Sequence, residues 1–246
     1  MTIPSDEEIL AILRGGKLDM QGEFLWGSNY TFLLQVERNG DVFKAVYKPT
    51  RGERPLWDFP PASLAKREVA AYLVSQALGW RLVPPTVYRR NAPIGPGSLQ
   101  YYVEHDPEYH YFTFSENDRQ RLRPVVAFDL LVNNADRKGS HVMVDAGGNL
   151  WLIDHGICFH IEDKLRTVLW DFAGETVPAD LLRDVEAFRL KLSPEGEAPT
   201  ELAAGLGRYL NMGEITALAR RAERLVNSGC FPNPNPNRRP YPWPPI

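Results

Sequence analysis

The chain has 246 residues, of which 43% are hydrophobic and 11% aromatic, and its formal net charge is −3. This composition excludes an intrinsically disordered chain, and the slight acidic excess excludes a broadly basic nucleic-acid-binding surface. With 2 cysteines, an acidic N-terminus and no long apolar run, the sequence predicts a reduced cytoplasmic protein without a membrane span.

The N-terminal part is expected to form a small β-rich lobe with one main helix. Ser5 and Glu8 have capping-box spacing, which predicts a short helix through Leu13. Strand-like runs follow at 24–26, 30–36, 42–47, 83–88 and 99–103. Asn39-Gly40 is typical of a tight hairpin turn. Apolar residues at helical spacing predict a helix over 63–78, between the third and fourth strands.

From about Ser115 the pattern becomes helical. The apolar residues of 125–131 predict a buried helix that leads into the loop 133–141. The run 142–152 predicts two short strands joined by a Gly-Gly turn. Two further helices are expected, at 178–192 and 214–226, followed by a tail rich in proline and asparagine that should lie extended.

These elements predict one domain, 1–246, with a cleft between two lobes. The β-rich N-lobe is expected over 20–104 and the helical C-lobe over 113–230, with a hinge near 104–112. The proline-rich tail occupies 231–246.

Two acidic residues flank the predicted hairpin. Asp136 lies in the loop before the first strand and Asp154 directly follows the second, so the hairpin should bring the two carboxylates close together. Phosphoryl transfer uses such a pair: one carboxylate orients or deprotonates the acceptor, and the other holds the metal that bridges the phosphates. Either aspartate alone is more often a turn or cap residue.

A lysine and a glutamate upstream complete a candidate nucleotide site. Strand alternation places Lys44, Val46 and Lys48 on one face, from which Lys48 could reach the phosphates of ATP. Glu68, inside the following helix, could pair with that ammonium. The alternatives are an exposed lysine at a strand end and a surface glutamate favoured by the helix dipole.

A phosphate-covering loop is less distinct. Gly27-Ser28-Asn29 lies between two strand-like runs, where a tight turn could aim backbone N–H groups at phosphates. The chain has no G-x-G-x-x-G or Walker A pattern, and an ordinary hairpin turn is the alternative. Arg137 and Lys138 are equally compatible with neutralising a transferred phosphate and with a solvated loop.

The motifs, taken in order, resemble the phosphatidylinositol 3-/4-kinase superfamily, with type II phosphatidylinositol 4-kinases and HipA-like kinases as its most similar branches. The matching stretches include Val46-Tyr47-Lys48-Pro49, 67–73, Asn134-Ala135-Asp136-Arg137 and 152–159, and the similarity spans roughly 24–175. The resemblance implies a compact bacterial member with an α+β, two-lobed protein-kinase-like fold.

The resemblance also implies residue roles. Lys48 would bind the phosphates of ATP and Glu68 would brace it, while Asp136 would be the catalytic aspartate and Asp154 the metal ligand. Ser28 and Asn29 would belong to the phosphate-covering loop.

One position departs from the family. His141 stands five residues after Asp136, where relatives usually have an asparagine that serves as a second metal ligand. An imidazole suits Mn²⁺ better than Mg²⁺, and it titrates at a reference pKa of about 6.5. The alternative is that His141 only hydrogen-bonds to nearby carboxylates.

The sequence therefore predicts an ATP-dependent phosphotransferase that uses Mg²⁺ or Mn²⁺. The runner-up is a nucleotide-binding pseudokinase, and a third option is an interaction protein recruited through the tail. Because Arg238-Arg239 is the longest basic feature, far short of the roughly four to eight basic residues of a lipid-binding cluster, we expect no stable membrane association and a soluble acceptor.

Overall fold

The structure, a computed structural model, describes residues 5–24, 29–192 and 199–246. Its helices are α1 (Asp6–Gly15), α2 (Leu64–Leu78), α3 (Glu116–Gln120), α4 (Arg123–Val132), α5 (Ala179–Leu192), α6 (Glu201–Leu206) and α7 (Met212–Ser228). Its strands are β1 (Lys17–Glu23), β2 (Phe32–Arg38), β3 (Asp41–Pro49), β4 (Thr86–Arg89), β5 (Gly97–Tyr101), β6 (His105–His110), β7 (Val142–Asp145) and β8 (Leu150–Leu152). Short 3₁₀ helices occupy Thr50–Gly52 and Gly139–His141.

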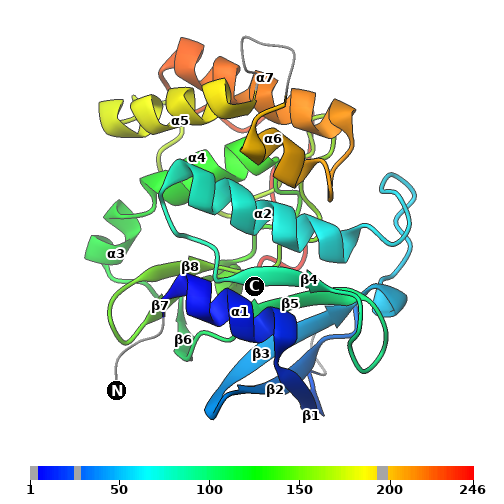
Figure 1. Cartoon of the computed structure of the whole chain (residues 1–246). Coiled ribbons are helices and arrows are strands. Elements are labelled where there is room, and N and C mark those ends of the chain that lie inside the picture. The colour runs from blue at the N-terminus through cyan, green and yellow to red at the C-terminus, as the bar shows by residue number, and fades with distance from the viewer. Residues whose placement is uncertain (1–4, 25–28, 193–198) are drawn as a thin grey trace.

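The N-terminal half builds a five-stranded antiparallel sheet in the order β1-β2-β3-β5-β4. Figure 1 shows this sheet below the helices, with α1 packed against it. The capping box of Ser5 and Glu8 starts α1 as predicted. Asn39 and Gly40 both have positive φ, 55° and 91°, which is the tight turn that joins β2 to β3 without splaying the strands.

Strand β3 separates a core face from a cleft face. Ala45 and Tyr47 are buried in a core that also contains Leu34 and residues of α1. Lys48, one position further along, points to the opposite face because side chains alternate along a strand. The predicted alternation is therefore confirmed.

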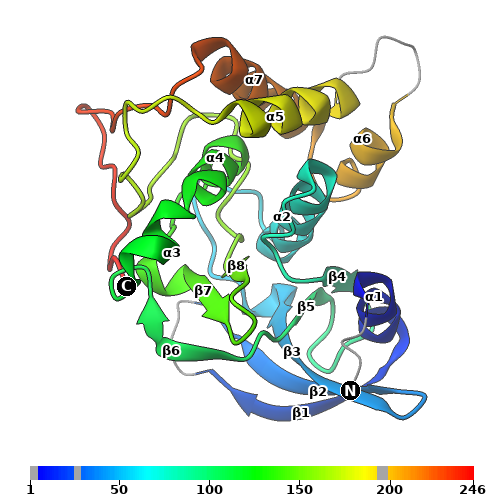
Figure 2. The same ribbon diagram turned by 90° about the vertical axis from the view of Figure 1, so that its left-hand side faces the viewer.

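A second sheet differs from expectation at the predicted hinge. The segment 104–112 contains strand β6, which pairs with β7 in a three-stranded sheet of order β6-β7-β8. Figure 2 shows this sheet between the five-stranded sheet and the helices. The hairpin of β7 and β8 is the one predicted over 142–152. Strand β1 was missed because nearly all of its side chains are exposed, so it lacks an apolar alternation.

The larger core lies among α2, α4, α5, α7 and the second sheet. Phe128 and Leu131 are fully buried there, as the apolar run predicted, and so is Leu122 just before that run. One buried ion pair crosses this core: Arg67 of α2 donates to Glu214 of α7 and also to the Cys158 carbonyl. This pair fixes α2, which carries Glu68, to the helical part of the molecule.

The tail 231–246 forms neither a helix nor a continuous strand. In Figure 2 it descends from α7 along one side of the molecule and ends beside α3. Both cysteines are free thiols, Cys158 buried and Cys230 exposed. No helix within the described ranges combines the length and the apolarity that a bilayer span requires.

Candidate active site

Lys48 and Glu68 form the centre of the site. The Lys48 ammonium lies 2.5 Å from Glu68 Oε1, which joins β3 to α2. Only 3% of the Glu68 side chain is exposed, so its carboxylate is shielded from water. The first turn of α2 is held by Glu53, whose carboxylate accepts the N–H groups of Leu64 and Ala65. Glu53 thus supplies the N-terminal cap that the Ser63 side chain does not, a role that no sequence pattern indicated.

The second oxygen of Glu68 reaches a different segment. Glu68 Oε2 accepts the backbone N–H of His155 at 2.9 Å. One buried carboxylate therefore holds both the Lys48 ammonium and the chain directly after Asp154. The role of brace predicted for Glu68 is compatible with this geometry, and its alternative, an ordinary surface charge, does not fit a buried side chain.

Asp154 follows β8 with a positive φ of 62°. A non-glycine residue in the left-handed region is strained, and such residues gather at functional sites. Its Oδ1 lies 3.0 Å from the Lys48 ammonium, and its Oδ2 lies 3.4 Å from His141 Nε2. Although burial would raise the pKa of Asp154, the charge of Lys48 outweighs it and holds that pKa well below the usual range.

Lys48 is held in its charged form by the same contacts. Burial alone would lower the pKa of Lys48, but the charges of Asp154 and Glu68 raise it above its usual value. The side chain is 21% exposed, so the ammonium retains access to the cleft.

His141 is neutral at physiological pH, contrary to the expected titration near 6.5. Burial lowers the pKa of His141 to about 4, with Asp154 only partly opposing the shift. The ring accepts the Lys138 N–H at Nδ1 over 3.4 Å, which leaves the proton on Nε2, facing Asp154. In this tautomer His141 donates to the carboxylate.

Asp136 lies in the loop 133–141, next to this group. Its backbone N–H donates to Asn134 Oδ1 at 2.9 Å, which fixes the turn. Burial raises the pKa of Asp136 to about 6, with Lys138 opposing the shift and the negative charge of Asp154 adding to it. The Lys138 ammonium is 3.8 Å from Asp136 Oδ2. The hairpin has brought the two aspartates near enough to influence each other's ionisation.

A buried ion pair supports the loop from below. Arg137 makes a bidentate contact with Asp129 of α4 and donates to the carbonyls of His141 and Ile153. Arg137 is fully buried, so neither a phosphate-neutralising role nor a solvated position is correct. Arg137 also donates to His155 Nε2 at 2.8 Å. The fully buried His155 ring therefore supports the loop from the interior. No sequence pattern indicated a role for Asp129, because its partner Arg137 lies eight residues away across a turn.

The phosphate-covering loop is described only in part. Ser28 lies outside the described residues. Asn29 Oδ1 accepts the backbone N–H of Arg54 at 2.7 Å, so its side chain ties this loop to the segment after β3. In this position Asn29 organises the loop through its side chain.

The residues fit a divalent metal only as a pair. Among the described residues no group of three or more His, Cys, Asp or Glu side chains could hold a metal ion. Asp154 Oδ2 and His141 Nε2, 3.4 Å apart, could be neighbouring ligands once the imidazole proton moves to Nδ1. Mg²⁺ and Mn²⁺ at kinase-like sites take their other ligands from phosphates and water, so a protein pair is sufficient.

Comparison with known proteins decides the family. The family described as phosphatidylinositol 3- and 4-kinase matches residues 62–197. The chain belongs to this family. A bacterial relative, protein Rv2133c of Mycobacterium tuberculosis (strain ATCC 25618 / H37Rv), is 38% identical over 279 residues, covering 99% of this chain and 97% of that protein.

Solved structures agree on the fold. Hydra Fam20 with sugar is similar with a TM-score of 0.59 at 15% identity, covering 92% of this chain and 90% of that one. The Golgi casein kinase with Mn/ADP bound is similar with a TM-score of 0.53 at 16% identity, covering 98% of this chain and 80% of that one. The Helicobacter pylori proinflammatory kinase CtkA is similar with a TM-score of 0.52 at 10% identity, covering 89% of this chain and 94% of that one. The predicted superfamily and the α+β, two-lobed protein-kinase-like fold are confirmed.

Proposed function

We propose that this member of the family is an ATP- and divalent-metal-dependent phosphotransferase. The observation that supports it most is the chain of contacts in which Glu68 and Asp154 share the Lys48 ammonium. Lys48 would bind the phosphates of ATP and Glu68 would hold it in place. The metal, bound at Asp154 with or without His141, would neutralise charge on the phosphates. Asn29, with Ser28, would organise the loop over them.

Asp136 would act on the acceptor. A carboxylate with a pKa of about 6 is ionised at physiological pH and basic enough to accept a hydroxyl proton. Lys138, close to Asp136, would stabilise negative charge on the transferred group. Most of the acceleration would come from positioning and charge stabilisation, since phosphoryl transfer requires little covalent chemistry from the protein.

A thermal-shift measurement tests the nucleotide site. ATP with Mg²⁺ or Mn²⁺ at about a hundred times its dissociation constant should add about 2.7 kcal/mol to the free energy of unfolding. This raises the Tm by about 5–11 °C for a chain of this size. Lys48→Met and Asp154→Ala should each reduce the nucleotide-dependent shift, whereas Lys17→Met, on the exposed strand β1, should preserve it. No shift in wild type with either metal would refute the ATP site.

The second candidate is a pseudokinase, and His141 favours it. Its proton faces Asp154, so in this tautomer the neutral ring offers the metal no lone pair at Nε2. Such a protein would show the nucleotide-dependent thermal shift without forming ADP. Measuring ADP formation with and without candidate acceptors separates the two functions.

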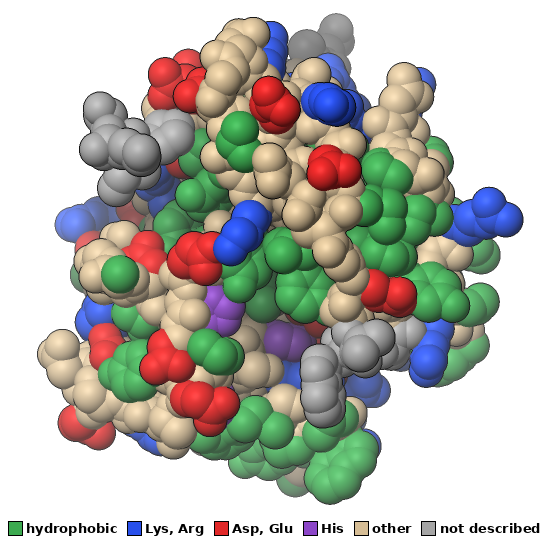
Figure 3. Space-filling view, turned by 90° about the horizontal axis from the view of Figure 1, so that it is seen from below, with side chains coloured by type: hydrophobic (Ala, Val, Ile, Leu, Met, Phe, Trp, Pro, Cys, Tyr) green, Lys and Arg blue, Asp and Glu red, His purple; other side chains and the backbone are tan. Residues whose placement is uncertain are grey.

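Three further assignments belong to this proposal. The lobes are assigned to 20–104 and 113–230, with the tail at 231–246. The acceptor is assigned as soluble and the protein as cytoplasmic. On the face drawn in Figure 3, charged side chains of both signs are interspersed and basic ones do not gather into one patch, which supports a soluble acceptor.

A further inference from the structure

The tail packs along the loop that contains Asp136. The Pro245 carbonyl accepts the Gly139 N–H at 2.8 Å, and the Pro240 carbonyl accepts the Thr167 N–H at 3.0 Å. Thr167 in turn bridges to Arg137, the residue after Asp136. The end of the chain is therefore tied through its backbone to both segments that surround the catalytic aspartate.

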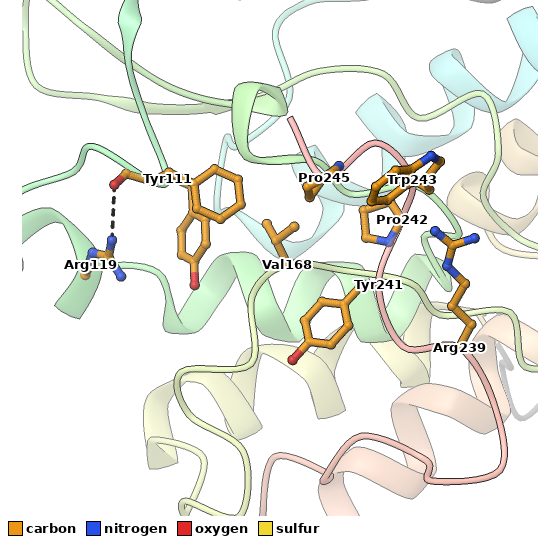
Figure 4. Close-up of a pocket in the computed structure, with 9 residues that line it drawn as sticks. Tyr111, Arg119, Val168, Arg239, Tyr241, Pro242, Trp243 and Pro245 are labelled. Atoms are coloured by element: carbon orange, nitrogen blue, oxygen red, sulfur yellow. Dashed lines mark hydrogen bonds between the residues drawn. The ribbon is translucent and has the colours of Figure 1, made fainter.

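A cavity of about 610 Å³ lies between the tail and the segment 111–119. Figure 4 shows Tyr111 and Arg119 on one side, Tyr241 and Trp243 on the other, and Val168 between them. The volume is in the range of small-molecule sites, which is about 300–1,000 Å³.

The walls of this cavity touch the backbone beside Asp136. The Val168 N–H donates to the Arg137 carbonyl at 3.2 Å. From the other wall, the Phe112 ring packs so closely on Gly139 that an added Cβ there would lie 2.6 Å from it. A molecule in the cavity would thus be separated from the loop by Val168 and Phe112, and a group that extends past this wall would approach Asp136, which does not itself line the cavity.

The lining specifies the chemistry of the occupant. Phe112, Tyr241 and Trp243 are exposed, Trp243 to 76%, and exposed aromatic side chains clustered at one place mark a binding surface. The lining contains two arginines and no acidic side chain. Arg119 Nη1 lies 3.7 Å from Asp171 Oδ1, so this arginine has a carboxylate partner. The Arg239 guanidinium lies over the Trp243 ring, its Cζ 5.8 Å from the ring centroid, and has no carboxylate partner in the described ranges.

We propose that this cavity binds the phosphoryl acceptor, and that the acceptor is a small hydroxylated molecule with a planar apolar ring and an anionic group. The proposal rests on the phosphotransferase function. The ring would pack between Trp243 and Phe112, and the anion would meet Arg239. The hydroxyl oxygen bonds to the γ-phosphorus of ATP, the bond from that phosphorus to the β–γ bridging oxygen breaks, ADP leaves with the electron pair, and the hydroxyl proton passes to Asp136.

Two fluorescent probes of matched shape test the cavity. 8-Anilinonaphthalene-1-sulfonate carries a planar apolar naphthalene ring and an anionic sulfonate, and N-phenyl-1-naphthylamine has the same rings without the charge. Both are titrated with saturating ADP and Mn²⁺ present, so that the nucleotide site is filled. Trp243→Ala and Phe112→Ala, from opposite walls, should each lower the affinity for both probes about tenfold. Arg239→Gln should lower the affinity for the sulfonate only.

Two controls carry the same substitutions elsewhere. Trp57→Ala removes a tryptophan that is 91% exposed outside the cavity, and Arg90→Gln removes an exposed arginine after β4. Both variants should bind the probes as wild type does. The proposal would be overturned if Trp57→Ala lost as much probe affinity as Trp243→Ala, or if ADP displaced the probes. It would also be overturned if Trp243→Ala and Phe112→Ala both bound the probes with wild-type affinity.

Turnover links the cavity to the acceptor step. The sulfonate should slow ADP formation by wild type with the same midpoint as its binding, and Trp243→Ala should resist it. A protein that binds the probe but turns over ATP unchanged would refute the acceptor assignment alone. Absence of the nucleotide-dependent thermal shift would instead refute the nucleotide site, and a thermal shift without ADP formation would refute the phosphotransferase in favour of the pseudokinase.

Discussion

Asp136→Asn is expected to stabilise the protein while abolishing phosphoryl transfer. Burial raises the pKa of Asp136 to about 6, so at pH 7.5 the fold holds an ionised carboxylate where the neutral acid is preferred. A pKa change of this size corresponds to about 3 kcal/mol. Because 29% of the side chain is exposed, solvent screening reduces this to about 1–2 kcal/mol, or about 2–8 °C in Tm.

The pH dependence of this gain identifies its cause. Below about pH 4 the carboxyl is protonated in both folded and unfolded chains, so wild type and Asp136→Asn should differ least there. As the pH rises from about 4 to about 6, the unfolded wild-type chain releases this proton while the folded chain still holds it, so wild type loses stability and the Tm difference should grow, reaching its plateau above pH 6. Asp145→Asn is the matched control of opposite sign. Burial would raise the pKa of Asp145, but hydrogen bonds from Trp151 and Asn149 outweigh it and lower that pKa, so removing this carboxylate should destabilise the protein at neutral pH.

Thermal unfolding of wild type and both variants between pH 4 and 8 is the assay. An equal or lower Tm for Asp136→Asn at pH 7.5, or a gain already complete at pH 4, would refute the electrostatic reasoning. The same ionisation should appear in catalysis: turnover by wild type should rise with pH to half its maximum near 6, since only the carboxylate can accept the hydroxyl proton.

Three other predictions concern separate features. His141→Asn should move the metal preference from Mn²⁺ toward Mg²⁺, and an unchanged metal profile would mean that His141 is no ligand. Because burial lowers the pKa of His141 to about 4, the His141 ring itself should not titrate between pH 5 and 8. Glu214→Gln leaves Arg67 charged and buried, so it should lower the free energy of unfolding, measured in urea, by about 3–5 kcal/mol. Glu223→Gln, on the exposed face of α7, should leave that free energy near the wild-type value, and an equal loss in both variants would contradict the buried pair. The purified protein should stay in the supernatant with anionic liposomes at physiological salt, and salt-sensitive co-sedimentation would favour a lipid acceptor instead.

The residues of the candidate site were predictable because their signals are local. Asp136 and Asp154 flank a short hairpin, and Lys48 ends a strand of clear alternation. A hairpin and a strand fix where their side chains point within a few residues, so the pattern carries the geometry. Glu68 needed the resemblance as well, since a helix position alone does not distinguish a brace from a surface charge.

The supports of the site were not predictable from the sequence. Arg67 meets Glu214 and Glu68 meets the His155 backbone over long sequence separations, and such pairs depend on how helices pack. The lowered pKa of His141 is likewise a property of its burial, which no neighbouring residue encodes. The sequence supported the reference pKa of about 6.5, and burial, with the charges of Arg137, Lys48 and Lys138, lowered it.

The sequence by itself determined the family, the two-lobed fold and the order of the candidate residues, because hydrophobic period, turn residues and motif spacing are written in neighbouring positions. The tertiary structure alone decided that the tail lies against Gly139 and Thr167 and forms one wall of an open aromatic cavity near the loop that contains Asp136. Those contacts run through backbone carbonyls of prolines. A carbonyl is present at every residue, so its hydrogen bonds leave no mark in the sequence and are fixed only when distant segments pack together.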